Sequence, residues 1–254
     1  MNHLPGIYPH IVTITPAIKS QGQDYIGLGY TQHDEQFVLK PGGMIGTAEF
    51  IGAALCQVVG IPFCQPTVVT IERLGAKQAV FGSRMELGIV NFNHTDIASW
   101  QTIASKCSNL GAFSALLAID LALGNDDRHW NNWIVQDGKT AAGTDTHRLR
   151  ALDFSRAWPV DHPPQHPLRH RSPNTWQSPR DWDSLGVPFV QSVFYDACAV
   201  IGALPTNWLR GVLSQLACVY LKIEDVDLLC QWWDSHWREQ VIDTIDSLEN
   251  GARP

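Results

Sequence analysis

The chain has 254 residues, of which 44% are hydrophobic and 17% are charged, which is enough for one domain of two lobes or for two small domains. Its formal net charge is −7, and its 18 Lys and Arg residues are scattered, which argues against a duplex-binding surface because phosphate neutralisation needs clustered cations. We therefore expect no nucleic acid as the main partner.

Cysteine usage and hydropathy indicate the compartment. The six cysteines form no CxxC pair and mostly stand in apolar surroundings, which is typical of buried, reduced thiols. No segment near the N-terminus has the charged-then-apolar order of a signal peptide. The longest apolar run, residues 110–123, is too short to cross a bilayer and contains Asp120. We expect a cytoplasmic protein that does not enter membranes.

The first part of the chain predicts a small sheet with one helix. Alternating apolar, β-branched and aromatic residues predict short strands at residues 11–18, 25–31, 36–40, 67–72 and 79–85. Apolar residues at helical spacing predict one helix over residues 48–59, with Thr47 as its N-cap and Gly60 just after its end. The strands are expected to form a five-stranded antiparallel sheet.

From residue 96 onward the pattern is mainly helical. Residues 112–123 are apolar nearly all the way round, which predicts a buried helix. Two short strands around a hairpin are predicted at residues 133–135 and 149–152. Six prolines in residues 158–186 predict a long irregular segment there. Further helices are predicted at residues 100–107, 188–203, 207–221 and 225–248.

The stretch with the highest density of polar and charged side chains directly follows the predicted buried helix. Residues 124–132 read GNDDRHWNN and place two carboxylates, Arg, His and three Asn in nine positions. Such polar groups are costly to bury without partners, so this density favours a functional loop over a core segment. Asp120, inside the helix, is interpreted as a structural carboxylate that bonds loop backbone groups.

Four separated elements of the chain together resemble a kinase. Asp127 stands five residues before Asn132, the spacing of a protein-kinase catalytic loop, and the Asp-Arg-His order is similar to HipA-like and phosphoinositide-kinase-like enzymes. Lys40 ends a strand, and Glu49 follows nine residues later in a helix. Asp153 begins the sequence DFS where a kinase has its metal-binding Asp-Phe-Gly. The chain most resembles the HipA-like kinases.

This resemblance implies an α+β, bilobal protein-kinase-like fold. Residues 1–89 would form an N-terminal nucleotide-binding lobe, made of a small antiparallel β-sheet with one helix. Residues 90–254 would form a larger, mainly helical catalytic lobe. The implied activity is Mg²⁺-dependent transfer of the ATP γ-phosphoryl group to a hydroxyl, with Ser or Thr of a protein as the expected acceptor. ATP and Mg²⁺ are the implied cofactors.

The resemblance also assigns roles to single residues. Asp127 would orient the acceptor hydroxyl and accept its proton, with His129 bracing the loop. Asn132 and Asp153 would hold Mg²⁺ through oxygen atoms. Lys40 would bind the α and β phosphates and pair with Glu49.

Further roles follow for the rims of the implied site. Backbone groups around Met85, Glu86 and Gly88 would read the adenine edge. The turn at residues 20–24 would cover the phosphates, and Ser20 is the candidate for autophosphorylation. Arg128 could contact the segment after Asp153, and an antitoxin-like protein is a partner implied by the family.

Two departures and several alternatives accompany this hypothesis. Ser155 replaces the glycine of the kinase triplet, and the turn at residues 20–24 has one glycine, Gly22. A sparse glycine loop favours a nucleotide-binding pseudokinase or scaffold as one alternative. A small-molecule or phosphoinositide kinase meets the same phosphoryl geometry. A metal-dependent phosphohydrolase is a further alternative, and it would use Asp126, Asp127, His129 and Asp153.

Overall fold

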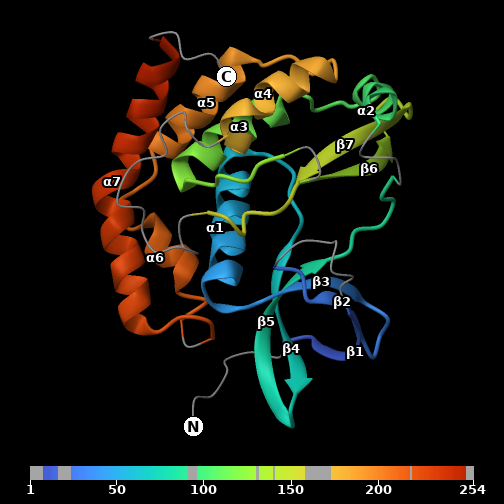
Figure 1. The fold of residues 1–254 in the computed structure, drawn as a ribbon, viewed down its shortest axis with the longest axis vertical. Helices are drawn as coiled ribbons and strands as arrows, with labels where there is room; N and C mark the ends of the chain where they lie inside the picture. The colour runs from blue at the N-terminus through green and yellow to red at the C-terminus, as the bar shows by residue number, and fades with distance from the viewer. Residues whose placement is uncertain are drawn as a thin grey trace.

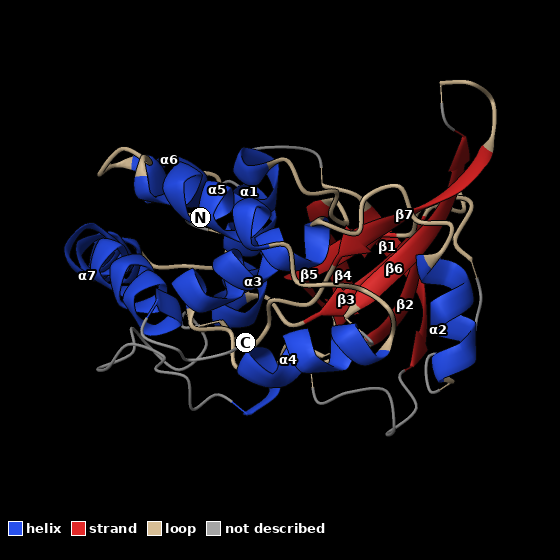
Figure 2. Ribbon diagram, turned by 90° about the horizontal axis from the view of Figure 1, so that it is seen from above, coloured by secondary structure: helices blue, strands red, loops and turns tan. Residues whose placement is uncertain are grey.

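The structure is a computed structural model that describes residues 8–16, 24–90, 96–129, 132–139, 141–157, 173–217 and 219–249. Strands are concentrated in the first third of the chain and helices in the rest, so the α+β class is confirmed. Figure 2 shows most helices on one side of the molecule and the strands on the other, with α2 (Ile97–Ala104) beyond the strands.

The first five strands close into a barrel, which corrects the expected antiparallel sheet. They pair in the order β1-β2-β3-β5-β4, and the β1–β4 pair that closes the ring is parallel. This pair aligns His10 with Thr70 and Ile11 with Ile71, so the barrel has no free edge. The strands are β1 His10–Pro16, β2 Gly27–Thr31, β3 Gln36–Lys40, β4 Pro66–Arg73 and β5 Ala76–Arg84.

The barrel has a small apolar core of its own. Its buried members alternate along the strands, as expected for side chains that share one face. They are Ile11, Phe37, Leu39, Val69, Ile71 and Val80. Because neighbouring residues of a strand point to opposite faces, Lys40 points away from this core and toward the helix α1.

Helix α1 (Gly43–Val59) lies between the barrel and the helices α3 and α5 (Figure 1). It begins five residues before the predicted start, at Gly43 instead of residue 48. Thr47 is therefore not its N-cap; the Thr47 hydroxyl donates a hydrogen bond to the carbonyl oxygen of Gly43 inside the first turn, at 2.8 Å. The helix ends at Gly60, which adopts a left-handed conformation with φ of 83°, as predicted.

Helix α3 and the hairpin after it set the geometry of the GNDDRHWNN loop. Helix α3 spans Ala112–Leu123, and its residues from Phe113 to Leu123 are all buried. The hairpin strands β6 (Trp133–Lys139) and β7 (Asp145–Ala151) are longer than predicted. Their register aligns Trp133 with Ala151, and the backbone N–H of Leu152 donates to the carbonyl oxygen of Asn132 at 3.3 Å. The hairpin thus brings the end of the loop beside Asp153.

Helix α4 (Pro173–Ser184) corrects the prediction that residues 158–186 are irregular; residues 158–172 lie outside the described part. Pro173 stands at the first helical position, where proline is tolerated. Pro179 lies inside the helix and cannot donate to the carbonyl of Thr175. The Ser178 hydroxyl binds that carbonyl at 2.7 Å instead, so the missing donor is replaced.

The chain ends in three helices, α5 (Gln191–Gly202), α6 (Trp208–Leu213) and α7 (Ile223–Glu249). The predicted helix over residues 207–221 is wrong in length, because α6 stops at Leu213 and a turn follows, in which the Ser214 hydroxyl binds the carbonyl of Gly211. Among the described helices, none combines the length and the apolar character that a membrane span requires.

Candidate active site

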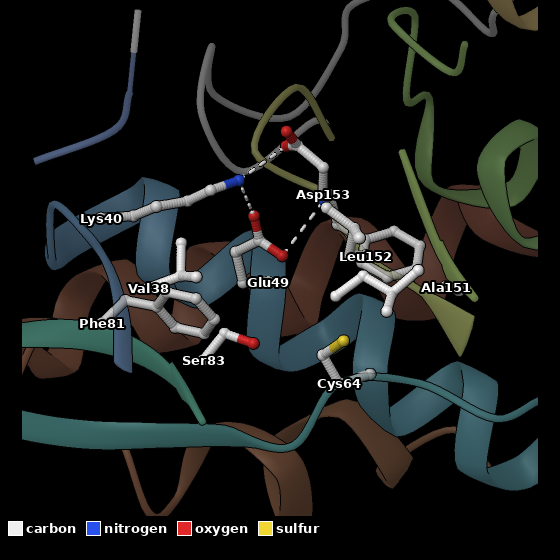
Figure 3. Close-up of a pocket in the computed structure, with 12 residues that line it drawn as sticks. Val38, Lys40, Glu49, Cys64, Phe81, Ser83, Ala151, Leu152 and Asp153 are labelled. Atoms are coloured by element: carbon white, nitrogen blue, oxygen red, sulfur yellow. Dashed lines mark hydrogen bonds and ion pairs between the residues drawn. The ribbon is translucent and has the colours of Figure 1, made fainter. Parts of the chain in front are cut away.

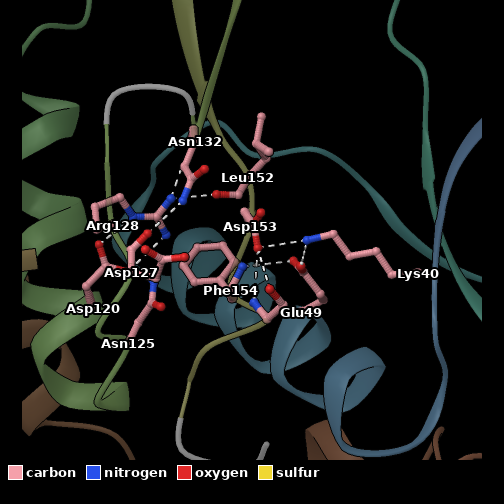
Figure 4. Close-up of polar contacts among 11 residues, drawn as sticks. Lys40, Glu49, Asp120, Asn125, Asp127, Arg128, Asn132, Leu152, Asp153 and Phe154 are labelled. Carbon is pink, nitrogen blue, oxygen red and sulfur yellow. Dashed lines mark hydrogen bonds and ion pairs between the residues drawn. The ribbon is translucent and has the colours of Figure 1, made fainter. Parts of the chain in front are cut away.

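Lys40, Glu49 and Asp153 meet in one cluster (Figure 4). Lys40 Nζ lies 2.6 Å from Glu49 Oε1 and 2.8 Å from Asp153 Oδ1. Lys40 ends β3, Glu49 lies in α1, and Asp153 follows β7, so three distant parts of the chain contribute. The expected ion pair between Lys40 and Glu49 is present, and Lys40 binds Asp153 as well.

Glu49 also holds the residue after Asp153. Its Oε2 accepts a hydrogen bond from the backbone N–H of Phe154 at 3.1 Å, so both oxygens of this buried carboxylate have partners. Gly52, on the same face of α1, lies under the Phe154 ring, and a Cβ added to Gly52 would stand 2.2 Å from that ring. Helix α1 therefore fixes the backbone and the side chain of Phe154.

Asp153 adopts a conformation that is rare for a residue with a side chain. Its φ of 66° lies in the left-handed region, which persists where surrounding contacts enforce it. The Ser155 backbone N–H and hydroxyl both donate to Asp153 Oδ1, at 3.3 and 2.7 Å. Ser155, which stands where the kinase triplet has glycine, thus orients the Asp153 carboxylate.

The electrostatics of the cluster favour the charged forms of Lys40 and Asp153. Burial alone would lower the pKa of Lys40, but the carboxylates of Glu49 and Asp153 outweigh it and raise that pKa above its ordinary value. Burial alone would raise the pKa of Asp153, but Lys40 and the Ser155 hydroxyl lower it to about 2. Lys40 is therefore a permanent cation at neutral pH.

Arg128 and Asp120 form a second, fully buried ion pair. Arg128 Nε donates to Asp120 Oδ2 at 2.7 Å, and Arg128 Nη2 donates to Asp120 Oδ1 at 2.9 Å. The guanidinium also contacts the chain on both sides of Asp153: Nη1 binds the Leu152 carbonyl, and Cζ lies 4.9 Å from the centroid of the Phe154 ring. Asp120 is a structural carboxylate as predicted, but side chains bind it rather than loop backbone groups.

Two oxygen atoms near this pair suit a hard metal ion. Asn132 Nδ2 donates to the Asp127 carbonyl at 2.9 Å, which leaves Asn132 Oδ1 as the atom for a ligand. Asp153 uses Oδ1 for Lys40 and Ser155, whereas its Oδ2 accepts no hydrogen bond from the described residues. Amide and carboxylate oxygens are ligands that Mg²⁺ prefers, so Asn132 and Asp153 fit this ion.

The carboxylates of the loop do not assemble a metal cluster of their own. Asp126 is exposed, whereas Asp127 and His129 are half-buried. In the described part of the chain, no three His, Cys, Asp or Glu side chains lie close enough together to hold a metal ion. Among the described residues, Asp126, Asp127, His129 and Asp153 therefore do not form the metal-holding cluster that a phosphohydrolase would use.

A cavity of about 60 Å³ lies beside Lys40 and Asp153 (Figure 3). Its wall includes Cys64, Phe81 and Ser83, which sequence reasoning missed because they belong to no motif. The alternation of β5 is a signal that would have paired Phe81 with Ser83 on one face. The wall consists of Val38, Lys40, Glu49, Ala53, Cys64, Phe81, Ser83, Ile134, Ala151, Leu152, Asp153 and Phe154.

The residues expected to read the adenine edge lie outside this wall. The Met85 backbone N–H donates to a carbonyl of β3 at 2.8 Å, and the Gly88 carbonyl accepts from the backbone N–H of Asp137 at 2.8 Å. These bonds join the segment after β5 to the barrel and to the β6–β7 hairpin. A role for Met85, Glu86 and Gly88 in adenine binding stays a prediction, and Ser20 lies outside the described residues.

Comparison with known proteins finds similarity at the level of structure. No protein-family model and no curated protein matches the chain. It is similar to the proinflammatory kinase CtkA of Helicobacter pylori, at 12% identity and a TM-score of 0.46, over 91% of this chain and 96% of that one. It is similar to HipA of Shewanella oneidensis MR-1, solved with HipB and operator DNA of a toxin–antitoxin system, at 12% identity and a TM-score of 0.48.

The match to HipA covers 89% of this chain but 65% of the HipA chain, so this chain spans slightly less than two thirds of that protein. At 12% identity such a likeness assigns no activity to this chain, because one fold hosts many functions. Only the residues of the site can therefore indicate the function.

Proposed function

We propose that the protein is an ATP-dependent phosphotransferase that moves the γ-phosphoryl group of ATP to a hydroxyl. The observation that carries this proposal is the buried ammonium of Lys40, held between Glu49 of α1 and Asp153. Phosphoryl transfer depends on positioning and on charge more than on covalent chemistry. A cation fixed beside a carboxylate that keeps one oxygen for a metal supplies both requirements.

Different side chains of the site bind the phosphates and the metal ion. Lys40 binds the α and β phosphates of ATP, and Glu49 keeps the Lys40 side chain extended. Asp153 Oδ2 and Asn132 Oδ1 would hold Mg²⁺, since amide and carboxylate oxygens suit this ion. When bound, this ion neutralises the negative charge of the transferring phosphoryl group.

The loop supplies the group that handles the proton. Asp127 accepts the proton of the acceptor hydroxyl as its oxygen approaches the γ-phosphorus. The carbonyl of Asp127 is tied to Asn132 Nδ2 at 2.9 Å, so the residue that handles the proton and the residue that holds the metal move together. His129, two residues on, braces the loop.

The acceptor is proposed from the family resemblance. A Ser or Thr hydroxyl of a protein is the expected acceptor, and Ser20 is the candidate within this chain. An antitoxin-like protein is a proposed partner. In this proposal the nucleotide lies between an N-terminal lobe of residues 1–89 and a catalytic lobe of residues 90–254, with the adenine beside Met85, Glu86 and Gly88.

A nucleotide-binding protein without transfer activity is the second candidate. The observation that favours it is the sparse glycine loop, because the turn at residues 20–24, which would cover the phosphates, has one glycine, Gly22. Lys40 and Asp153 also bind each other directly, so phosphates must separate them before Lys40 can bind a nucleotide. A small-molecule or phosphoinositide acceptor is an alternative within the first candidate.

Intact-mass spectrometry after incubation with Mg²⁺ and ATP tests the proposal. We expect a mass gain of one or more phosphoryl groups on the wild type or on an added protein acceptor, and none with Asp127→Asn or Asp153→Asn. Peptide mapping then reports whether Ser20 is modified. Thermal stabilisation by Mg²⁺ and ATP without a mass gain on any acceptor tried favours the second candidate, and the absence of both responses contradicts both candidates.

A further inference from the structure

Arg128 is a charged residue that the proposed transfer reaction does not use, although it is the immediate neighbour of Asp127. Its side chain is completely buried, and its three nitrogens all have partners. Nε and Nη2 bind the two oxygens of Asp120, which gives a planar, two-point ion pair with a fixed orientation. Asp120 lies in the buried helix α3, so the guanidinium is anchored to a helix of the core.

The third nitrogen of Arg128 joins the two segments that carry the proposed metal ligands. Nη1 donates to the carbonyl oxygen of Leu152 at 2.5 Å and to that of Asn132 at 3.3 Å. Leu152 directly precedes Asp153, and Asn132 is itself one of the two ligands. Figure 4 shows Arg128 beside Asn132 and Leu152, with Asp153 next in the chain. One nitrogen atom therefore spans the backbones of both metal-binding segments.

Neighbouring side chains hold the same loop in place from the other side. The Arg128 backbone N–H donates to the Thr175 hydroxyl of α4 at 3.1 Å, and that hydroxyl donates to the Asn125 carbonyl at 2.6 Å. Asn125 Nδ2 in turn donates to Asp120 Oδ1 at 2.7 Å. These bonds hold the stretch from Asn125 to Arg128 against α4 and Asp120.

We infer that Arg128, oriented by Asp120, is a positioning residue that sets the distance between Asn132 and Asp153 and so prepares both for a divalent cation. This inference rests on the proposed function, because it concerns the same metal site. A role in stability alone is a weaker explanation, since buried ion pairs add little net stability over apolar side chains of similar volume. Residues that orient metal ligands usually change metal affinity when they are replaced.

Mn²⁺ binding in the presence of a non-hydrolysable ATP analogue tests this inference without any turnover. Free Mn²⁺ is measured by electron paramagnetic resonance for the wild type, for Arg128→Lys, and for the double variant Asp120→Asn with Arg128→Met. The double variant removes both charges, so no uncompensated buried charge opposes folding. Leu229→Ala, in the buried part of α7, is a control that weakens the fold away from the site.

We expect both Arg128 variants to bind Mn²⁺ about 10 to 100 times more weakly than the wild type, the range typical of residues that orient metal ligands. Leu229→Ala should bind Mn²⁺ like the wild type at a temperature where thermal melting shows it folded. Unchanged Mn²⁺ affinity in the folded double variant overturns the inference. If the double variant does not fold, Arg128→Lys decides, because the three donors of an ammonium lie on one nitrogen and cannot replace the four hydrogen bonds that the planar guanidinium makes.

Binding measurements on the wild type distinguish a failure of this inference from a failure of the proposed function. If the wild type binds neither Mn²⁺ nor the ATP analogue, the proposed function fails and the inference fails with it. If the wild type binds both and the Arg128 variants bind them equally well, only the positioning role is overturned. A loss of affinity in Leu229→Ala equal to that in the Arg128 variants also overturns it, because general destabilisation would then explain the effect.

Discussion

Lys40 and Asp153 are separated by 113 residues in the sequence, yet Lys40 Nζ and Asp153 Oδ1 lie 2.8 Å apart. The contact depends on the barrel, which ends β3 at Lys40, and on the β6–β7 hairpin, which delivers Asp153. Glu49 completes it from α1. Each proposed role in phosphate and metal binding depends on these three elements holding their places.

Removing the charge of Lys40 should damage both stability and activity. Lys40→Met leaves the buried carboxylate of Glu49 without its cation, and breaking a buried ion pair costs about 3–5 kcal/mol. Urea unfolding should show this loss, and phosphoryl transfer should disappear. Lys222→Met changes an exposed lysine and should alter stability by less than about 0.5 kcal/mol. Equal stability of the two variants would contradict the importance of the cluster.

Acid should weaken the fold through Asp153. The folded pKa of Asp153, about 2, lies below its ordinary value of 3.8, so its ionised form stabilises the fold above that ordinary value. This contribution declines as the pH falls from about 5 toward the folded pKa. The unfolding free energies of the wild type and Asp153→Asn should therefore differ most near pH 6, and the difference should shrink as the pH falls toward about 2. A gap that widens with acid would contradict the charge assignment.

The contact between Gly52 and Phe154 predicts that position 52 of α1 does not tolerate a larger side chain. A methyl group at position 52 would stand 2.2 Å from the root of the Phe154 ring, so Gly52→Ala must displace Phe154 or the helix. We expect a destabilisation of about 1–3 kcal/mol and weaker nucleotide binding. Gly211→Ala, in α6, meets no atom within 4 Å among the described residues and should be neutral or stabilising by about 0.5–1 kcal/mol. Thermal melting of both variants measures the difference.

Ser155 should matter through its hydroxyl. Ser155→Ala removes the 2.7 Å hydrogen bond to Asp153 Oδ1 and should cost about 1 kcal/mol, with a smaller stabilisation by Mg²⁺ and ATP in thermal-shift assays. Ser184→Ala removes a similar hydrogen bond, from an exposed hydroxyl to a carbonyl at the end of α4, and should leave the response to Mg²⁺ and ATP unchanged. An identical response from both variants would show that Ser155 does not orient Asp153.

Local patterns in the sequence predicted the elements that depend on local interactions. Helix α3 was predicted at residues 112–123 because its apolar run ends at a glycine that can adopt a left-handed conformation. The pair of Lys40 and Glu49 was predicted from the resemblance to HipA-like kinases, and the structure contains this pair. The closed barrel was not predicted, because the β1–β4 pairing joins residues about 60 apart and has no local signal. Helix α4 was missed because Ser178 replaces the donor that Pro179 lacks, which composition does not reveal.

The contacts between Asp120 and Arg128 were also only partly predicted from the sequence. Asp120 was recognised as structural, but its partner Arg128, eight residues away, was assigned a contact with the segment after Asp153 alone. The two-point ion pair and the contact with Leu152 depend on how the loop folds back across α3. Likewise, Cys64 lies just before β4 and Ser83 lies in β5, and no motif connects either of them to Lys40.

The most direct test of the central claim is a crystal structure of the protein with Mn²⁺ and a non-hydrolysable ATP analogue. The account predicts an anomalous Mn²⁺ peak bound by Asp153 Oδ2 and Asn132 Oδ1, with the phosphates between Lys40 and Asp153. It also predicts that Lys40 keeps its contact with Glu49 while its contact with Asp153 opens. Nucleotide or metal bound away from Lys40 and Asp153 would contradict the account.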